Sequence, residues 1–257
     1  MAAGRLKAVR IVQRNMLVNR HGWIVIFSGF FEPVFYLFGL GLGLGSIVGD
    51  VMVGGRTVSY AVFVAPALLA TSCMNGAITE GCFNVFFKLH RRGTYEGILA
   101  TPLGVADVAL GEMAWALIRG TLYAAAFIVI ISLMGFSLSL WALLALPAAV
   151  LVSAAFAGFA IMLTSFMTEI NHFERVMNLV VLPMFLFSGT FFPLSVYPAS
   201  LRAVVQLLPL YHATALLRAL TTGSVGPDSL THVVYLLVMM AASIWIAARR
   251  LQRRIVV

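Results

Sequence analysis

Apolar stretches alternate with short polar segments along the 257 residues of the chain. A helix needs roughly 20 apolar residues to cross the hydrocarbon core of a bilayer. Most of the stretches reach about that length, and a shorter one contains Pro183. They lie at residues 23–44, 58–87, 106–133, 140–167, 177–192 and 231–248. The pattern predicts an all-α integral membrane protein with six transmembrane helices.

The longest polar interruption between these stretches covers residues 88–104. It opens with basic residues, and Thr94 is placed to cap a short helix that Pro102 stops. The apolar positions at helical spacing are Tyr95, Ile98 and Leu99. The pattern predicts an amphipathic helix between the second and third spans. Two interpretations stay open: a solvated loop that rests on the membrane surface, and a handle that a cytosolic partner grips.

Residues 5–20 form a second amphipathic pattern. Val9, Val12 and Met16 lie on one side of a helical wheel, and basic residues lie on the other side. The basic positions are Lys7, Arg10 and Arg14. This separation predicts an interfacial helix along the cytoplasmic headgroups.

Prolines divide the segment between the fifth and sixth spans into two short pieces, residues 199–208 and 212–220. Each piece has one apolar face, but neither is long enough to cross the membrane. The prolines concerned are Pro193, Pro198 and Pro209. Because proline interrupts a regular helix, the two pieces cannot merge into one. Residues 193–222 are therefore predicted to form a re-entrant helical hairpin that dips into the outer leaflet and returns.

The composition supports a membrane protein. Hydrophobic residues make up 61% of the chain and charged residues 10%, and the mean hydropathy is +1.01. An ordinary soluble domain has about 25% charged residues. The net charge of +8 would suggest a nucleic-acid partner in a soluble chain, but these cations stand at the ends of apolar stretches. There they act as topology signals that face anionic headgroups, so no nucleic-acid partner is predicted.

The distribution of positive charge predicts the orientation. With six spans both termini lie on one side, and that side carries thirteen Lys and Arg against three on the other. The positive-inside rule then places both termini and residues 88–104 in the cytoplasm and residues 193–222 outside. We expect a multi-pass protein of the cell (inner) membrane.

Polar residues inside the predicted spans are costly in lipid and are functional candidates by default. In the second span they share one sector of the helix: Ser72, Asn75, Thr79 and Glu80. Together with Glu32 in the first span, this sector is the predicted translocation pathway. Glu112 and Arg119 in the third span lie two turns apart, so each is expected to meet a partner on another helix or to reach an interface. For the carboxylates, a structural hydrogen bond and a pathway role both stay open.

The sequence lacks the motifs of an enzyme. It has no Walker A pattern, no His/Glu metal spacing and no Ser–His–carboxylate cluster. The glycine-rich run at residues 39–45 lacks the strand–turn–helix context of a nucleotide loop and instead contains small-xxx-small pairs for close helix packing. Cys73 and Cys82 fall in one apolar stretch and are predicted to be free thiols. We therefore predict a non-enzymatic chain without a bound metal or cofactor.

Two segments resemble a known family. Residues 94–103 read TYEGILATPL, and residues 187–193 read FSGTFFP ahead of the proline-flanked hairpin. With the spans and the N-terminal helix, they resemble the permeases of ABC-2-type exporters. The resemblance is closest to the branch that holds nodulation lipo-oligosaccharide and drug-resistance exporter permeases, and it covers nearly the whole chain.

The resemblance implies a single transmembrane domain over residues 1–257 that pairs with a second permease copy or a paralogue. Separate ABC ATPase subunits would use ATP and Mg. They would touch the amphipathic helix within residues 88–104, which would serve as the coupling helix. The implied contact residues are Tyr95, Glu96, Ile98, Leu99 and Pro102. The outer hairpin would help to close the exit, with Gly189, Pro193, Pro198 and Pro209 as its marker residues.

The implied mechanism is ATP-driven export. Closure of the ATPase subunits would push the coupling helix, rock the first, second and fifth spans and open a route along the subunit interface. The implied cargo is amphiphilic: a lipid-linked glycan, a glycolipid or a hydrophobic drug.

Two other classes of function stay open. A proton-coupled secondary transporter would use Glu32, Glu80 and Glu112 as proton sites, but the external half-helices and the absence of an evident inverted repeat argue against it. An assembly or scaffold subunit without transport activity is the third class.

Overall fold

The structure is a computed structural model that describes residues 2–19, 31, 33–53, 55–90, 94–136, 139–169 and 171–255. Four helices in this part of the chain are long and apolar enough to cross a membrane. They are Tyr60–Lys88, Ala106–Leu133, Leu140–Phe166 and Pro227–Arg250. These helices match the predicted second, third, fourth and sixth spans, and the count of six stays a prediction.

The second span is the central helix of the bundle. Within its most apolar window 94% of the residues are buried, whereas the corresponding value for the sixth span is 17%. The span is composed of α4 (Tyr60–Ile78), η2 (Thr79–Asn84) and α5 (Val85–His90). The elements packed against α4 include α7 (Val105–Leu133), α8 (Ala145–Phe166) and α12 (Pro209–Thr222). Two of the most buried polar residues, Ser72 and Glu80, therefore lie on the central helix of the bundle.

The described part of the first span is an apolar helix, Pro33–Val48, that is shorter than a full crossing. It contains the π-helical segment η1 (Leu37–Leu44) and ends in α3 (Gly45–Val48). Glu32 and residues 20–30 lie outside the described residues, so the predicted pathway role of Glu32 is not tested. π-Helical turns also occur in the second and fifth spans, in η2 and in η4 (Met177–Val181).

The glycine run at residues 39–45 serves helix packing, as predicted. Only one face of this helix, the one toward α4, is closely packed. A Cβ added at Gly41 would lie 3.7 Å from the Cα of Ala61, and one at Gly45 would lie 3.8 Å from the Cβ of Tyr60. Gly39 and Gly43 have open space around the same position. The pair formed by Gly41 and Gly45 thus lets η1 approach α4 closely.

A β-hairpin connects the first and second spans where the sequence predicted a short loop and the start of a helix. Strand β1 (Asp50–Val53) pairs antiparallel with β2 (Arg56–Ser59), and Val51 lies opposite Val58. The signal was present in the sequence, because a Gly-Gly pair between alternating apolar positions is typical of a two-residue hairpin turn. Gly55 has a φ of 78°, which a residue with a side chain rarely adopts. The second span therefore begins two residues later than predicted, at Tyr60.

The fifth span is an irregular helix that runs through α9 (Asn171–Val176), η4 and α10 (Leu182–Phe187). It begins at Asn171, in the polar segment ahead of residue 177, and ends at Phe187, so the predicted limits of 177 and 192 are wrong at both ends. Pro183 lies two residues after the π-helical turns of η4, within this continuous helix, where it cannot donate a backbone hydrogen bond.

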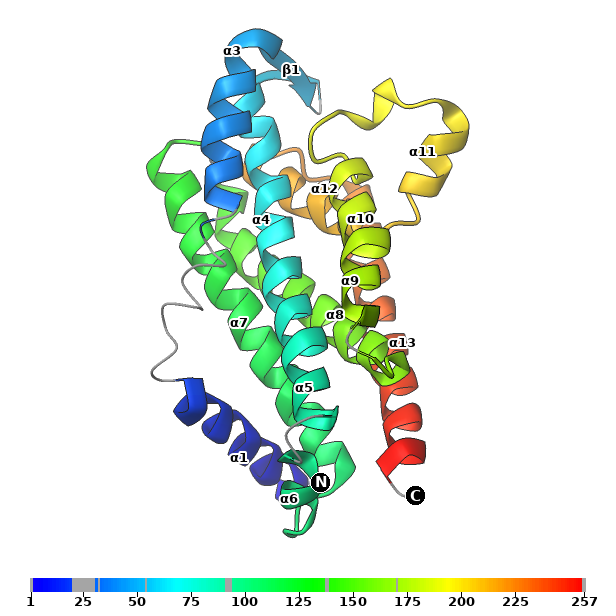
Figure 1. Ribbon diagram of the computed structural model, residues 1–257. Coiled ribbons are helices and arrows are strands. Elements are labelled where there is room, and N and C mark those ends of the chain that lie inside the picture. Colours follow the sequence, from blue (N-terminus) through cyan, green and yellow to red (C-terminus); the bar gives the residue numbers. More distant parts are fainter. Residues whose placement is uncertain are drawn as a thin grey trace.

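Two short helices follow at the upper end of the bundle (Figure 1). They are α11 (Ala199–Val205) and α12, and they are bent by 86° relative to each other. Pro198 directly precedes α11, and Pro209 is the first residue of α12. Pro193 directly precedes the short turn η5 (Leu194–Val196). The prolines thus separate the helices as predicted, and α13 (Pro227–Ile255) then leaves from the same end of the bundle.

The two ends of the bundle carry different elements. Helix α1 (Ala2–Asn19), helix α6 (Thr94–Leu99) and the C-terminal end of α13 lie at the lower end in Figure 1. Strand β1 and helices α3 and α11 lie at the upper end. Both termini are therefore at one end, as an even number of spans requires.

Helix α1 packs on α7 through a face that the sequence analysis did not identify. Val9 and Met16, from the predicted apolar face, are exposed, whereas Ile11 and Asn15 are buried. A Cβ added at Gly111 of α7 would lie 2.5 Å from the Cβ of Ile11, so only glycine permits this approach. Helix α1 therefore packs on the bundle with one face, and its opposite face stays exposed, where it can contact lipid.

Candidate functional site

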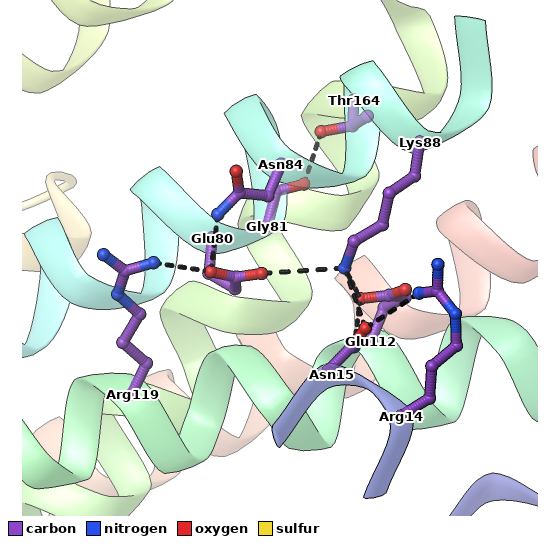
Figure 2. A network of polar contacts seen from close by, with 9 residues as sticks. All are labelled: Arg14, Asn15, Glu80, Gly81, Asn84, Lys88, Glu112, Arg119 and Thr164. Atoms are coloured by element: carbon purple, nitrogen blue, oxygen red, sulfur yellow. Dashed lines mark hydrogen bonds and ion pairs between the residues drawn. The ribbon is translucent and has the colours of Figure 1, made fainter. Parts of the chain in front are cut away.

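Four charged side chains form a buried chain of ion pairs where the second span, α7 and α1 meet (Figure 2). Arg119 Nη1 lies 2.6 Å from Glu80 Oε2, and Lys88 Nζ lies 3.7 Å from Glu80 Oε1. Lys88 Nζ also lies 2.7 Å from Glu112 Oε2. Cations and carboxylates therefore alternate in the order Arg119, Glu80, Lys88, Glu112. We call these four residues the ion-pair chain.

The ion-pair chain is almost fully shielded from solvent. Glu80 and Glu112 are each 1% exposed, Lys88 is 8% exposed and Arg119 is 7% exposed. An isolated charge at this depth costs several kcal/mol, and only pairing with good geometry recovers that cost. Two cations and two carboxylates sum to no net charge. The balance explains how closely packed membrane helices can hold four ionised groups.

Neutral side chains tie a third element into the ion-pair chain. Asn15 of α1 donates from Nδ2 to Glu112 Oε2 over 2.9 Å and accepts from Lys88 Nζ over 3.2 Å. Asn84 donates to Glu80 Oε2 over 2.7 Å. The N-terminal helix is thus joined to the second and third spans by buried polar contacts. The sequence pattern did not point to Asn15, which lies one turn after Ile11 on the buried face of α1.

The expectation for Glu112 and Arg119 is confirmed. They do not contact each other, and each meets a residue of the second span, Lys88 and Glu80 respectively. Arg119 Nε also donates to the hydroxyl of Tyr123 over 3.3 Å. Lys88 is the first basic residue of the segment 88–104, which was predicted to lie in the cytoplasm, but its ammonium group points into the bundle.

The π-helical segment η2 positions Glu80. Its wider turn leaves the carbonyl of Gly81 to accept a hydrogen bond from Thr164 Oγ1 of α8 over 2.7 Å. A Cβ added at Gly81 would lie 2.6 Å from the Cβ of Ala160, so η2 and α8 are in direct backbone contact there. Such π-turns are often found at functional sites in helices. Here the turn fixes the carboxylate between two cations.

The predicted coupling helix, α6, is held firmly by its own chain. Tyr95 is 5% exposed and Ile98 is 9% exposed, and both belong to a cluster of buried apolar residues. The other members are Ile11, Val85 and Val108, with Leu99 and Leu103 packed against them. Tyr95 and Ile98 therefore face α1, α5 and α7, which contradicts their prediction as anchors in a partner's groove. Glu96 and Pro102 are exposed and Leu99 is half-buried, so these residues are available to a partner.

The hydroxyl of Tyr95 lies close to the carboxylate of Glu112. Burial first, and then the negative charge of Glu112, raise the pKa of the Tyr95 phenol well above its usual range. The phenol is therefore protonated at physiological pH and presents its proton beside Glu112. Neither the hydroxyl nor Glu112 Oε1 has a hydrogen-bond partner among the described residues. This proximity connects α6 to the ion-pair chain.

The predicted pathway sector of the second span faces other helices. Ser72 is fully buried, Asn75 and Thr79 are half-buried, and Glu80 belongs to the ion-pair chain. A Cβ added at Gly76, in the same sector, would lie 3.0 Å from the Cα of Gly120 in α7. Ser72 and Glu80 are therefore shielded by neighbouring helices, as their polarity requires, whereas Asn75 and Thr79 are partly exposed. The role of the sector as a pathway stays a prediction.

A half-buried arginine fastens the outer hairpin to the bundle. Arg218 of α12 donates from Nε to the carbonyl of Phe63 over 3.1 Å and from Nη2 to the carbonyl of Gly189 over 2.7 Å. Its guanidinium carbon also lies 4.0 Å from the centre of the Phe63 ring. Gly189 has a φ of 73°, a conformation that favours glycine, and the turn points its carbonyl at Arg218. The hairpin marker Gly189 thus has a structural reason for its position.

We expect Arg218→Met to loosen the hairpin at a cost of about 2–3 kcal/mol, because two buried carbonyls lose a charged donor. Thermal unfolding and limited proteolysis of the detergent-purified protein measure the effect. Arg202→Met is the matched control, since the exposed Arg202 only touches the carbonyls of Ser195 and Tyr197 in the same hairpin. Equal protease resistance of both variants and the parent would contradict the fastening role.

Two histidines lie together at this end. His212 Nδ1 of α12 is 2.8 Å from His232 Nδ1 of α13, and the His212 ring stacks on Tyr235 at 3.8 Å. His212 Nε2 is 2.8 Å from the carbonyl of Gln206. A carbonyl only accepts, so the neutral His212 carries its proton on Nε2 and accepts from His232 at Nδ1. The sequence offered no local signal, because the two histidines are 20 residues apart.

The described residues contain no group of three or more His, Cys, Asp or Glu side chains that could hold a metal ion. Cys73 and Cys82 are free and buried, as predicted. The site is therefore made of ion pairs and helix contacts, and these features together define a multi-pass membrane protein with a polar centre at one end.

Comparison with known proteins places the chain in a family. Residues 8–222 match the family described as ABC-2 type transporter. Nodulation protein J of Rhizobium leguminosarum bv. trifolii is 32% identical over 256 residues, which cover 99% of this chain and 96% of that protein. Nodulation protein J of Bradyrhizobium diazoefficiens is 32% identical over 258 residues, covering 98% and 97% respectively. The chain belongs to the ABC-2 type transporter family and is a transport subunit of the nodulation protein J branch, not an enzyme in its own right.

Proposed function

We propose that the chain is the permease subunit of an ATP-driven exporter that moves an amphiphilic substrate out of the cytoplasm or the inner leaflet. The substrate would be a lipid-linked glycan, a glycolipid or a hydrophobic drug. The subunit would act with separate ABC ATPase subunits, which use ATP and Mg, and with a second permease copy or a paralogue. Its six spans would cross the cell (inner) membrane with both termini in the cytoplasm. Family membership and the similarity to nodulation protein J support this proposal.

The observation that supports the proposal most directly is the packing of α6 against the rest of the chain. Its buried face packs on α1, α5 and α7, and Tyr95 lies beside Glu112 of the ion-pair chain. Its other face leaves Glu96 and Gly97 exposed. A short helix that is fixed to three others moves with them as a unit, so force applied to its free face would reach the second and third spans. A loop that merely rested on lipid would not need such support.

The proton-coupled alternative gains no specific support from the described residues. Glu80 and Glu112 are both paired with cations, which favours a structural function for these carboxylates. The outer hairpin would close the exit in our proposal, with Arg218 as its attachment to the second span.

The exposed face of α6 provides the test. A Cβ added at Gly97 meets nothing within 4 Å, so Gly97→Trp should fold normally and yet block a docking partner. We expect the variant, alone or with Glu96→Arg, to lower co-purification of the ATPase at least about tenfold, since docking contacts at an interface centre are worth roughly 1.4 kcal/mol or more. Export should fall with it.

Gly226→Trp is the matched control, because Gly226 also has open space around its Cβ position and precedes α13 at the other end of the bundle. It should leave ATPase binding unchanged. Labelling of a Gly97→Cys variant in intact cells with a membrane-impermeant reagent checks the orientation. Normal ATPase binding and export in the Gly97→Trp variant would refute the coupling role, and labelling from outside would refute the topology.

A further inference from the structure

An apolar cavity of about 170 Å³ lies between the third, fourth and sixth spans. Helix α7 contributes Ala109, Leu110 and Met113, α8 contributes Ile161, and α13 contributes Ile244 and Ala247. Leu110 is 46% exposed, so the cavity opens on the surface of the bundle rather than in its centre. These positions fall near the start of α7 and near the ends of α8 and α13. The cavity therefore lies at the same end of the bundle as both termini.

The lining suits a hydrocarbon chain. Every described residue that lines the cavity is apolar or glycine. An apolar cavity of roughly 150 Å³ stays dry in water and accepts a benzene-sized guest. The present cavity is large enough for several methylene groups. In a membrane, a lateral opening of this kind faces acyl chains directly.

Two arginines, Arg249 and Arg250, directly follow the lining residue Ala248 in α13. The guanidinium carbon of Arg250 lies 3.8 Å from the centre of the Phe166 ring, and that of Arg249 lies 3.9 Å from the centre of the Trp245 ring. Both arginines are exposed, and neither forms an ion pair with another described residue. A guanidinium that lies flat on a ring keeps its N–H donors at the edge, where a phosphate can accept them.

We propose that this groove binds one anionic phospholipid of the cytoplasmic leaflet, with an acyl chain in the cavity and the phosphate at Arg249 and Arg250. The lipid would seal the contact between α7, α8 and α13 on the side where Gly158 of α8 already lies against α13. The inference takes from the proposed function only the assignment of this end to the cytoplasm. It does not depend on the ATPase or on the exported substrate.

Charge argues against a second copy of the chain as the occupant. A two-fold symmetric contact through the groove would bring the same patch of both copies together. Arg249 and Arg250 of one copy would then face those of the other, without described carboxylates beside them. An anionic headgroup complements the same patch.

The experiment uses the purified, delipidated permease in mild detergent. Native mass spectrometry counts bound lipid when dioleoylphosphatidylglycerol or dioleoylphosphatidylcholine, which share acyl chains, is added in turn. We expect one phosphatidylglycerol per chain to be retained in preference to phosphatidylcholine. Arg249→Gln with Arg250→Gln should weaken that retention about thirtyfold, which corresponds to roughly 1 kcal/mol for each arginine near an anionic lipid.

Two further variants keep the inference falsifiable. Ala109→Phe should fill the cavity and abolish retention of phosphatidylglycerol without loss of fold, which the thermal midpoint verifies. Arg202→Gln, at an exposed arginine of the outer hairpin, should change nothing. Equal retention of both lipids, or retention that survives both the double arginine variant and Ala109→Phe, would overturn the proposal. A disulfide between two copies through Leu110→Cys would show that a second chain covers the groove and would overturn it as well.

Discussion

Replacing Arg119 by leucine should destabilise the protein by about 3–5 kcal/mol, because the substitution leaves the buried carboxylate of Glu80 short of its nearest cation. Glu80 is 1% exposed and cannot recover the loss from water. Glu80→Leu should cost a similar amount, since the guanidinium of Arg119 then loses its only carboxylate among the described residues. Unfolding of the detergent-solubilised protein, followed by circular dichroism, measures both values.

The double variant Glu80→Leu with Arg119→Leu should recover most of this stability. It removes one charge of each sign and leaves the pair between Lys88 and Glu112 at 2.7 Å in place. Replacing a buried ion pair by apolar residues is often neutral or stabilising. Arg175→Leu, at an exposed position of α9, is the control and should change the unfolding free energy by less than about 0.5 kcal/mol. A double variant as unstable as the sum of the single ones would contradict direct pairing.

The same double variant separates two roles that the sequence left open. If Glu80 only joins helices, a stable double variant exports normally. If the carboxylate belongs to the translocation pathway, export fails although the protein is folded and the ATPase binds.

Tyr95→Ala should cost about 3–5 kcal/mol, the loss that is typical when a buried aromatic ring is removed. The ring fills the space between α1, α5 and α7, where Tyr95 is 5% exposed. Tyr95→Phe keeps the ring and removes a buried hydroxyl that has no hydrogen-bond partner among the described residues, so a change of less than about 0.5 kcal/mol is expected. Leu99→Ala removes a half-buried side chain and should fall between the two.

Thermal unfolding in detergent and ATPase co-purification should be measured on the same samples. We expect Tyr95→Ala to lower both the thermal stability and the ATPase co-purification, because α6 is no longer held in place. Gly97→Trp should lose ATPase binding alone. A Tyr95→Ala variant as stable as the parent would mean that the ring is not buried in the chain.

The sequence predicted the long helices well because twenty apolar residues in a row have few other solutions in a membrane. It also indicated that Glu112 and Arg119 each need a partner elsewhere, since a charge in lipid must be compensated. It could not name the partners. Lys88 reads as an ordinary basic residue at the end of a span, and only the packing of the second span against α7 turns its ammonium group inward.

The amphipathic spacing of α6 was visible in the sequence, but the spacing did not show which way its apolar face points. Spacing shows that Tyr95 and Ile98 share a face, and it does not say whether that face meets lipid, a partner or the same chain. The apolar face of α6 packs on Ile11 of α1, which is more than eighty residues away in the sequence. The β-hairpin before α4 is a different kind of miss, because its Gly-Gly turn was visible and was overlooked.

The π-turn in η2 also sets the rotational phase between the two halves of the second span. One residue corresponds to about 100° around an α-helix axis. If residues 79–84 closed into ordinary α-helical turns, α5 would turn by about that angle relative to α4. Lys88 would then swing away from Glu112, while Ser72 and its neighbours above the turn kept their places. The π-helical turn thus determines how α5 is rotated relative to α4, and the position of Lys88 depends directly on that rotation.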